Sequence, residues 1–297
     1  MTEVDTPTAP FRHDALIYSS VEDYLAGLVP FIRDGLEAGE PVLVVLAADK
    51  LAAIRDALGA DAAEVRFADM RAVGQNPARI IPAWAEFVAG DAPVRGIGEP
   101  VWAARSAAEL AEAQLHEALL NRAFSARPGF WLRCPYDRTT LSPEVIASVQ
   151  HSHPAPDDVS HVTLAGELPE PAQVAARLEY DAGTLPAVRQ TVREHAKRGG
   201  LDGTRIGHLV LAVHEAAANS VRHGGGRGIL RIWRDGKALV CEVRDRGEIS
   251  DPLIGRVRPQ PKAGGGRGLW IINQLCDLVQ VRSSGAGTVV RMHQRVA

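Results

Sequence analysis

The sequence predicts two domains, an α/β domain with a largely parallel sheet followed by an α+β sandwich. Three observations support this prediction. A chain of 297 residues is long enough for two separate cores. In the first half, apolar runs alternate with segments of helical periodicity, whereas in the second half helical segments precede a strand hairpin. We expect the domains at 11–153 and 173–297, with a linker at 154–172.

The first domain is predicted from "PVLVVLAA" (41–48), a continuous β-branched apolar run that suits a strand buried on both faces. Helical periodicity precedes it at 21–37 and follows it at 51–58. The alternation then continues, with strands in "EVRFADM", "VRGIGEP" and "GFWLRCPYD" and helices at 77–89 and 106–124. Strands that are separated by helices favour a parallel sheet.

The linker is predicted from "HSHPAPDD" and "LAGELPEPAQ", which are rich in proline, aspartate and glycine. The second domain begins with a strand near 175–180. Next come helices at 185–198 and 204–223, then a hairpin that turns at Asp235-Gly236. A glycine-rich loop, a helix at 269–276 and two strands complete the chain, so we expect helices on one face of a mixed sheet.

The composition excludes several classes of protein. The net charge is −3, from 33 basic and 36 acidic residues, which argues against direct binding of nucleic acid or an anionic membrane. No apolar run reaches the roughly 20 residues that cross a bilayer, and the N-terminus has no secretion signal. We therefore expect a cytoplasmic protein. Its cysteines form no CxxC pair, so we expect free, buried thiols without a metal or disulfide role: Cys134, Cys241 and Cys276.

The stretch "HEAAANSVRHGGG" (214–226) opens like the helix of a zinc protease. That motif needs a second histidine four residues after the first, where this chain has Ala218. Glu215 and Asn219 are four residues apart, so a helix projects both from one face. The presence of this polar pair on a mostly apolar helix therefore needs another explanation.

Three further features follow in the chain and indicate a nucleotide site. Asp245 and Gly247 end an apolar strand, the run at 264–268 precedes a helix, and Thr288 begins the last strand. Asp245 can accept a hydrogen bond from the exocyclic amine of adenine, and Gly247 lets the chain turn away from the base. The glycine run and the helix N-terminus offer backbone N–H groups to phosphates.

The polar helix pair completes this chemistry. Asn219 can supply an oxygen to Mg²⁺, which prefers hard oxygen ligands and bridges phosphates. Glu215, one turn earlier, can orient or deprotonate an attacking hydroxyl. His223 can touch phosphate, but it can equally cap the C-terminus of its helix.

These motifs resemble those of the GHKL ATPases, and most closely the anti-sigma-factor serine kinases. The matching segments are "HEAAANSVRHG", "VRDRG", "GGGRGLWIINQLCD" and "GTVVRM", in the family's order. The resemblance implies a Bergerat fold that binds ATP and Mg²⁺, with Glu215 as catalytic base and Asn219 as Mg²⁺ ligand. The nucleotide-binding residues that we carry over are Asn219, His223, Asp245, Gly247, Gly264, Gly265, Gly266, Arg267, Gly268, Leu269 and Thr288.

The resemblance leaves the reaction open. It implies a protein serine/threonine kinase that acts on an antagonist protein, or a domain that sequesters a sigma factor, and a homodimer is compatible with either. A non-catalytic, ATP-dependent binding module is the alternative. A sensor histidine kinase is less favoured, because His195 lies on a short helix without a long partner helix. The spacing H-E-A-x-x-N also recurs at 116–121, where no Asp-x-Gly or glycine-rich loop follows.

Residues 11–153 resemble the MEDS sensory domain, through segments that include "NPARIIPAW", "VRGIGEPVW", "HEALLNRAF" and "WLRCPYD". The resemblance implies a RecA-like fold that senses an unknown small molecule. The loop after 41–46 reads "AADKLAAI" and has no P-loop, so we expect no ATP hydrolysis there. His13 fits a buried strand entry as well as a ligand contact. A ligand pocket at the carboxyl edge of the sheet is expected from Arg95, Glu99, His116, Glu117, Asn121 and Tyr136.

Overall fold

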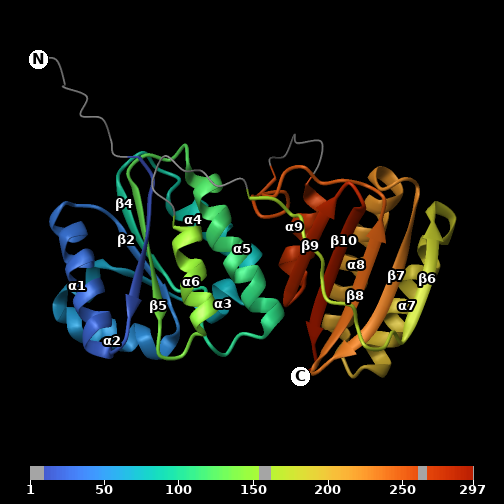
Figure 1. Cartoon of the computed structure of the whole chain (residues 1–297), viewed down its shortest axis with the longest axis horizontal. Coiled ribbons are helices and arrows are strands. Elements are labelled where there is room, and N and C mark those ends of the chain that lie inside the picture. Colours follow the sequence, from blue (N-terminus) through green and yellow to red (C-terminus); the bar gives the residue numbers. More distant parts are fainter. Residues whose placement is uncertain (1–9, 154–161, 260–265, 297) are drawn as a thin grey trace, which may run out of the picture. The chain divides into compact units, whose positions relative to one another are not determined.

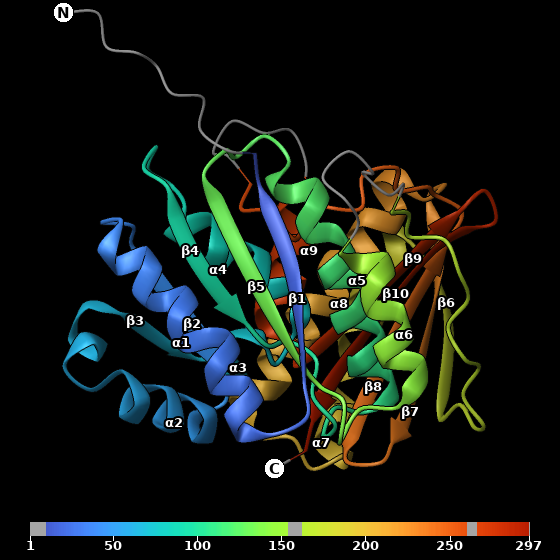
Figure 2. The same cartoon turned by 60° about the vertical axis from the view of Figure 1, so that its left-hand side comes forward.

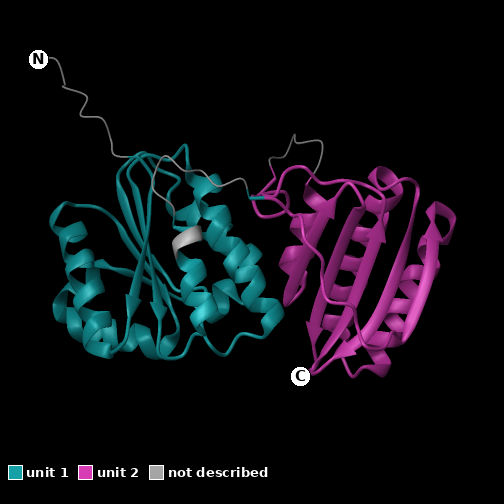
Figure 3. Cartoon of the chain, in the orientation of Figure 1, with its two compact units in different colours: residues 1–162 teal, residues 163–297 magenta. Residues whose placement is uncertain are grey.

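The chain divides into two compact units, Met1–Val162 (unit 1) and Thr163–Ala297 (unit 2) (Figure 3). This computed structural model describes residues 10–153, 162–259 and 266–296. Each unit contains its own five-stranded sheet (Figure 1). Within the described residues, no helix is long and apolar enough to cross a membrane.

Unit 1 is an α/β layer structure whose neighbouring strands all run parallel, in the order β1-β5-β4-β2-β3. Its strands are β1 (Arg12–Tyr18), β2 (Val42–Leu46), β3 (Arg66–Asp69), β4 (Val94–Gly98) and β5 (Phe130–Asp137). Its helices are α1 (Val21–Glu37), α2 (Ala48–Leu58), α3 (Met70–Gly74), α4 (Ile80–Phe87), α5 (Ala107–Phe124) and α6 (Pro143–Ser152). Helices α1 and α2 cover one face of the sheet, and α4, α5 and α6 cover the other (Figures 1 and 2).

The predicted parallel sheet of unit 1 is thus confirmed. Strand β2 is buried over almost all its length, as its unbroken apolar run predicts. Strand β1 was expected only as a strand entry at His13, and helix α6 was not predicted. β1 is an edge strand that opens with Arg12, His13 and Asp14, which hide the apolar alternation. α6 has ten residues, but it carries local start signals, since Ser142 caps it and Pro143 occupies its first turn.

The connection from β2 to α2 has no phosphate cradle. α2 begins at Ala48, directly after the strand, and its N-cap residue Ala47 makes no side-chain hydrogen bond. The sequence has no GxxxxGK(S/T) motif of a P-loop at this point.

Unit 2 has one sheet in the order β6-β7-β8-β10-β9, with its helices on one face (Figure 1). Every neighbouring pair of described strands is antiparallel, so the expectation of a mixed sheet is wrong. The reason is that two hairpins, β7–β8 and β9–β10, supply most of the sheet. The strands are β6 (Ala176–Asp181), β7 (Arg227–Asp235), β8 (Ala238–Asp245), β9 (Leu278–Ser284) and β10 (Gly287–Arg295), and the helices are α7 (Leu185–Arg198), α8 (Gly203–His223) and α9 (Arg267–Leu275).

Residues 163–172, which the sequence assigns to the linker, cross the helix-free face of this sheet (Figure 1). The carbonyl of Leu164 accepts a hydrogen bond from Ser283 N at 2.9 Å. Glu170 accepts from Arg231 and Arg244, each at 2.6 Å. The same two arginines donate to the buried carboxylate of Glu242, so this segment is anchored by a charge network on β7 and β8. The rest of the predicted linker, 154–161, lies outside the described residues.

Candidate functional site

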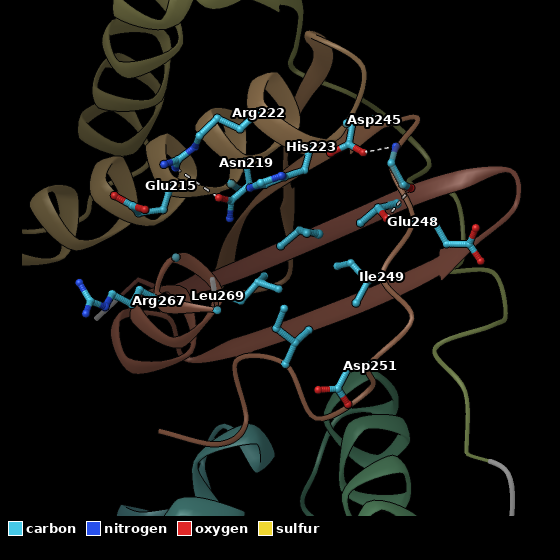
Figure 4. Close-up of a pocket in the computed structure, with 18 of the residues that line it drawn as sticks. Glu215, Asn219, Arg222, His223, Asp245, Glu248, Ile249, Asp251, Arg267 and Leu269 are labelled. Carbon is cyan, nitrogen blue, oxygen red and sulfur yellow. Dashed lines mark hydrogen bonds between the residues drawn. The ribbon is translucent and has the colours of Figure 1, made fainter. Parts of the chain in front are cut away.

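Helix α8 carries the polar pair that the sequence singles out. Its N-cap Asp202 accepts a hydrogen bond from Arg205 N, which fixes where the helix begins. An apolar stripe that includes Leu209, Val213 and Ala217 is buried against the sheet. Glu215 and Asn219 lie beside that stripe and are half-buried. Figure 4 shows both side chains along α8 at one side of a pocket.

Asp245 ends β8 and is fixed by its neighbours. In the antiparallel register it lies opposite Thr288 of β10. Its Oδ2 accepts a hydrogen bond from Ser220 Oγ at 2.6 Å, and its Oδ1 accepts one from Gly247 N at 2.7 Å. Thr288 Oγ1 donates to the carbonyl of Gly247 at 2.8 Å. A carboxylate has about four acceptor positions, so Asp245 retains capacity for a donor from a ligand.

Helix α9 begins at the opposite side of this pocket. Gly266 precedes it in the left-handed conformation, with φ of 85°, and supplies no side chain to cap the first turn. At Gly268, a Cβ atom would lie 2.7 Å from Asn219 Nδ2 and 3.2 Å from Glu215 Oε2. A side chain at this position would displace the ends of the Asn219 and Glu215 side chains, so glycine leaves room for both. The first turn presents backbone N–H groups, which favour an anion at this place.

These elements enclose a cavity of about 590 Å³, within the usual size of small-molecule sites. All of the predicted nucleotide-site residues that the structure describes line it: Glu215, Asn219, His223, Asp245, Gly247, Gly266, Arg267, Gly268, Leu269 and Thr288. Gly264 and Gly265 lie outside the described residues. The structure thus brings together motifs that are up to 73 residues apart in the chain, from Glu215 to Thr288.

Several residues of this site were not predicted from the sequence. Ser220 holds Asp245, and Ser283 lies 2.8 Å from Thr288 through their hydroxyl oxygens. Ser220 directly follows Asn219, so adjacency to the motif was an available signal. The apolar part of the wall gave no such signal, since Ile249, Ile254 and Val290 are ordinary strand and loop residues in the sequence.

The pocket predicted in unit 1 does not form as one group. Arg95 is the second residue of β4 and pairs with Val42, the first residue of β2, so it lies at the amino edge of the sheet. Its Nε donates to Glu40 at 2.5 Å, and its Nη1 donates to the carbonyl of Phe31 at 2.8 Å. Its assignment to a pocket at the carboxyl edge is wrong, because a strand position near the start of β4 cannot reach that edge.

Glu99 does lie at the carboxyl edge, directly after β4. Its Oε1 accepts from Lys50 Nζ at 2.5 Å and from Tyr18 OH at 3.2 Å. Burial raises the pKa of Glu99 to about 7, although its attraction to Lys50 opposes that shift. Glu99 therefore belongs to a charge cluster with residues that were not predicted as part of the pocket.

Glu117, Asn121 and Tyr136 form a separate group between the sheet and α5. Tyr136 OH donates to Glu117 Oε2 at 2.7 Å, and Asn121 Oδ1 lies 3.1 Å from His13 Nδ1. Glu117 also lies close to two histidines and a cysteine. We call these four residues the His-Cys-Glu group: His13, Glu117, Cys134 and His153. Asn121 and Tyr136 are hydrogen-bond partners of this group. His116 is also buried on α5, but it is not one of these residues.

This group is shielded from solvent. Glu117 is 1% exposed, and the side chains of His13 and His153 are 2% and 5% exposed. Burial lowers the pKa of His13 and raises that of the Cys134 thiol well above its usual range. All three cysteines are free and buried, as predicted.

Comparison with known proteins assigns each unit to a family. Residues 12–154 match the MEDS family, described as the methanogen/methylotroph, DcmR sensory domain, and residues 178–294 match the histidine kinase-like ATPase domain. The chain therefore carries a MEDS domain followed by a histidine kinase-like (GHKL) ATPase domain. No curated protein matches the chain in sequence.

Among solved structures, the chain is similar to the RsbU and RsbW domains of a protein from Mycobacterium tuberculosis. The identity is 20%, and the match covers 41% of this chain and 33% of that chain, with a TM-score of 0.31. The family matches, rather than this structure, identify the two domains.

Proposed function

We propose that unit 2 binds ATP with Mg²⁺ and transfers the terminal phosphoryl group to a serine or threonine of an antagonist protein, under the control of unit 1. A domain that captures a sigma factor when ATP is bound is a variant of the same proposal. One observation carries it. Glu215, Asn219, Asp245 and the start of α9 line one cavity in a domain that matches the histidine kinase-like ATPases.

Asp245 and its neighbours fit the adenine end of the nucleotide. Asp245 is held by Ser220 and Gly247 and can accept a further hydrogen bond from an exocyclic amine. Ile254, Leu269 and Val290 in the same lining supply apolar contacts for a flat ring. The geometry is preorganised, because the carboxylate is already fixed by two short hydrogen bonds.

Asn219 and the first turn of α9 fit the phosphate end. Asn219 lines the cavity, and its Oδ1, which accepts a 3.3 Å hydrogen bond from Arg222, can supply an oxygen to Mg²⁺ when the amide turns. The N–H groups at Arg267 to Leu269 complement negative charge. When bound, ATP supplies the phosphoryl group and Mg²⁺ offsets the charge of the phosphates.

Glu215 fits the role of base. It lies one helical turn before Asn219 and lines the cavity beside Gly268, near the expected phosphate end. Its carboxylate would accept the proton of the attacking hydroxyl, whose oxygen forms the new bond to phosphorus while ADP leaves. A purely binding domain does not require a base at this position.

The first test measures nucleotide binding by titrating the full chain with Mg-ATP in a calorimeter. We expect Mg²⁺-dependent binding that falls about 100-fold in Asn219→Ala, since a charged-group contact contributes about 1.5–3 kcal/mol. Glu194→Ala, an exposed glutamate on α7, is the control and should bind normally. Absence of binding by the unaltered chain would remove the ATP proposal.

The second test separates kinase from binding module. Mg-ATP labelled on its terminal phosphate is incubated with the protein in an extract of cells that express it. We expect acid-stable phosphoserine or phosphothreonine, reduced about 100-fold or more in Glu215→Ala, with ATP affinity changed little. Acid-labile label on the chain itself would indicate a histidine kinase. ATP binding without any transfer would identify a non-catalytic module.

A further inference from the structure

The His-Cys-Glu group of unit 1 has the composition of a metal site. It takes one side chain from each of four elements: β1, α5, β5 and the C-cap of α6. One ligand atom from each of the four lies within 4.8 Å of all the others. Imidazole nitrogen, thiolate sulfur and carboxylate oxygen are the protein ligands of zinc and similar ions.

The distances match the edges of a small tetrahedron. His13 Nε2 lies 3.3 Å from Cys134 Sγ and 3.4 Å from Glu117 Oε2. His153 Nε2 lies 3.3 Å from the same Glu117 oxygen. Metal–ligand bonds of about 2.0–2.3 Å give tetrahedral edges of roughly 3.3–3.7 Å. Three of the six distances between ligand atoms therefore already match one ion, and the remaining atoms lie within 4.8 Å of one another.

The hydrogen bonds around the two rings fix which nitrogen carries the proton. Asn121 Nδ2 donates to the carbonyl of Ser152 at 2.8 Å, so its Oδ1 faces His13 and accepts from His13 Nδ1. His153 Nδ1 lies 2.9 Å from the carbonyl of Val149, which can only accept. Both neutral rings consequently turn an unprotonated Nε2 toward the group, and oriented imidazoles of this kind are typical of metal ligands.

This arrangement needs a positive charge. Two Nε2 lone pairs and the anionic Glu117 oxygen would face one another across 3.3–3.4 Å. His153 Nε2 is buried and has no hydrogen-bond partner among the described residues. A single divalent ion satisfies every group at once.

We propose that the His-Cys-Glu group binds one divalent transition-metal ion in a tetrahedral site, with Zn²⁺ as the best fit. The charges of the ion, the Cys134 thiolate and the Glu117 carboxylate sum to zero, which suits a dry interior. Tyr136 donates to Glu117 and Asn121 accepts from His13, so the ligands have the outer hydrogen bonds that orient a metal site.

The site would join the end of α6 to the sheet. His153 is the C-cap of α6, whereas His13 and Cys134 lie on adjacent strands. The metal therefore fixes the C-terminal end of α6 against the sheet. Loading and loss of the ion provide unit 1 with two states that are independent of nucleotide binding in unit 2.

The test is cobalt substitution of the full chain after removal of metal with a chelator under reducing conditions. Co²⁺ should bind at one equivalent and give the intense visible bands of a tetrahedral site with a near-ultraviolet thiolate charge-transfer band. Excess Zn²⁺ should displace it and abolish both. Absence of these bands in the unaltered protein would overturn the proposal and leave a hydrogen-bonded group with a protonated histidine.

Matched cysteine variants locate the ion. Cys134→Ser should lose the charge-transfer band and weaken Co²⁺ binding about 100-fold or more, whereas Cys241→Ser, at a buried thiol of unit 2, should retain both. An unchanged band in Cys134→Ser would place the ion elsewhere and refute the site. Mg-ATP titration of the metal-free chain provides a separate readout, which should not change.

Discussion

The two units carry the same hexapeptide pattern, H-E-A-x-x-N, on a helix, and the fold gives it two environments. On α8, Glu215 and Asn219 are half-buried and line an open cavity. On α5, Glu117 is 1% exposed and accepts a hydrogen bond from Tyr136, and Asn121 is hydrogen-bonded to His13 and Ser152. The same local spacing therefore serves a candidate nucleotide site in one unit and a candidate metal site in the other.

The difference lies in what each helix faces. α8 faces Gly268, where the absence of a side chain leaves Glu215 and Asn219 open to a ligand. α5 faces β5, which fills the space with Cys134 and Tyr136. A helix sets which side chains share a face, but the opposite element decides whether they meet solvent, a ligand or other side chains.

The largest expected effect compares the two glutamates. Glu117→Ala should lower the free energy of unfolding of unit 1 by about 3 kcal/mol, because it leaves a cavity and an unsatisfied Tyr136 hydroxyl. Glu215→Ala should change the stability of unit 2 by less than about 0.5 kcal/mol. Urea unfolding followed by hydrogen exchange measures each unit separately. Equal losses in both variants would show that the two environments do not differ as described.

The two asparagines should differ next. Asn121→Ala removes the partner of both His13 Nδ1 and the Ser152 carbonyl, at a cost of about 1–3 kcal/mol in unit 1, with Mg-ATP affinity unchanged. Asn219→Ala should show the reverse, with weakened nucleotide binding and near-normal stability. Calorimetric titration of both variants measures their Mg-ATP affinity, and thermal unfolding measures their stability. Loss of ATP binding in Asn121→Ala would contradict it.

A glycine substitution tests why α8 remains open. Gly268→Ala places a Cβ 2.7 Å from Asn219 Nδ2, so the Asn219 side chain must move and Mg-ATP affinity should fall about tenfold, or about 1.4 kcal/mol. Gly207→Ala on α8 is the control, since a Cβ there meets nothing within 4 Å. Normal nucleotide affinity in Gly268→Ala would mean that the close approach of α8 and α9 is unimportant.

The smallest expected effect concerns an exposed glutamate, in contrast to the buried Glu117. Hydrogen bonds from Arg231 first, and also from Arg244, lower the pKa of Glu170 to about 2. Because this pKa is lowered, the ionised Glu170 side chain stabilises the fold at pH values above the ordinary glutamate pKa of about 4.3. This contribution disappears as the pH falls toward about 2. Solvent screening limits it to less than about 1 kcal/mol.

The contribution of the Glu170 charge to stability is measured by comparing the urea midpoints of the unaltered protein and Glu170→Gln across a range of pH. The variant should be less stable near neutral pH, and the two curves should converge as the solution is acidified below about pH 4. A difference that persists or grows in acid would show that the Glu170 charge does not hold residues 163–172 on the sheet.

Most of the secondary structure was predictable from local pattern. The helices at 21–37 and 185–198 begin and end as expected, since each has a clear apolar stripe and an end signal. Only the entry of β1 at His13 was expected, because this edge strand opens with polar residues, and α6 was missed although Ser142 and Pro143 gave it a start signal. The sheet of unit 2 was expected to be mixed although one of its hairpins was predicted, because strand patterns alone do not specify how the other strands pair.

The order and spacing of motifs, through the family resemblance that they carry, predicted the polar and glycine residues that line the pocket in unit 2 but not its apolar wall. The sequence alone determined these residue types and their local geometry. Only the tertiary structure decided the grouping in unit 1. Arg95 and Glu99, four residues apart, went to opposite edges of the sheet, while His13, Glu117, Cys134 and His153 met in its covered face. The physical reason is that such contacts between distant residues depend on strand order and helix packing, which no local pattern specifies.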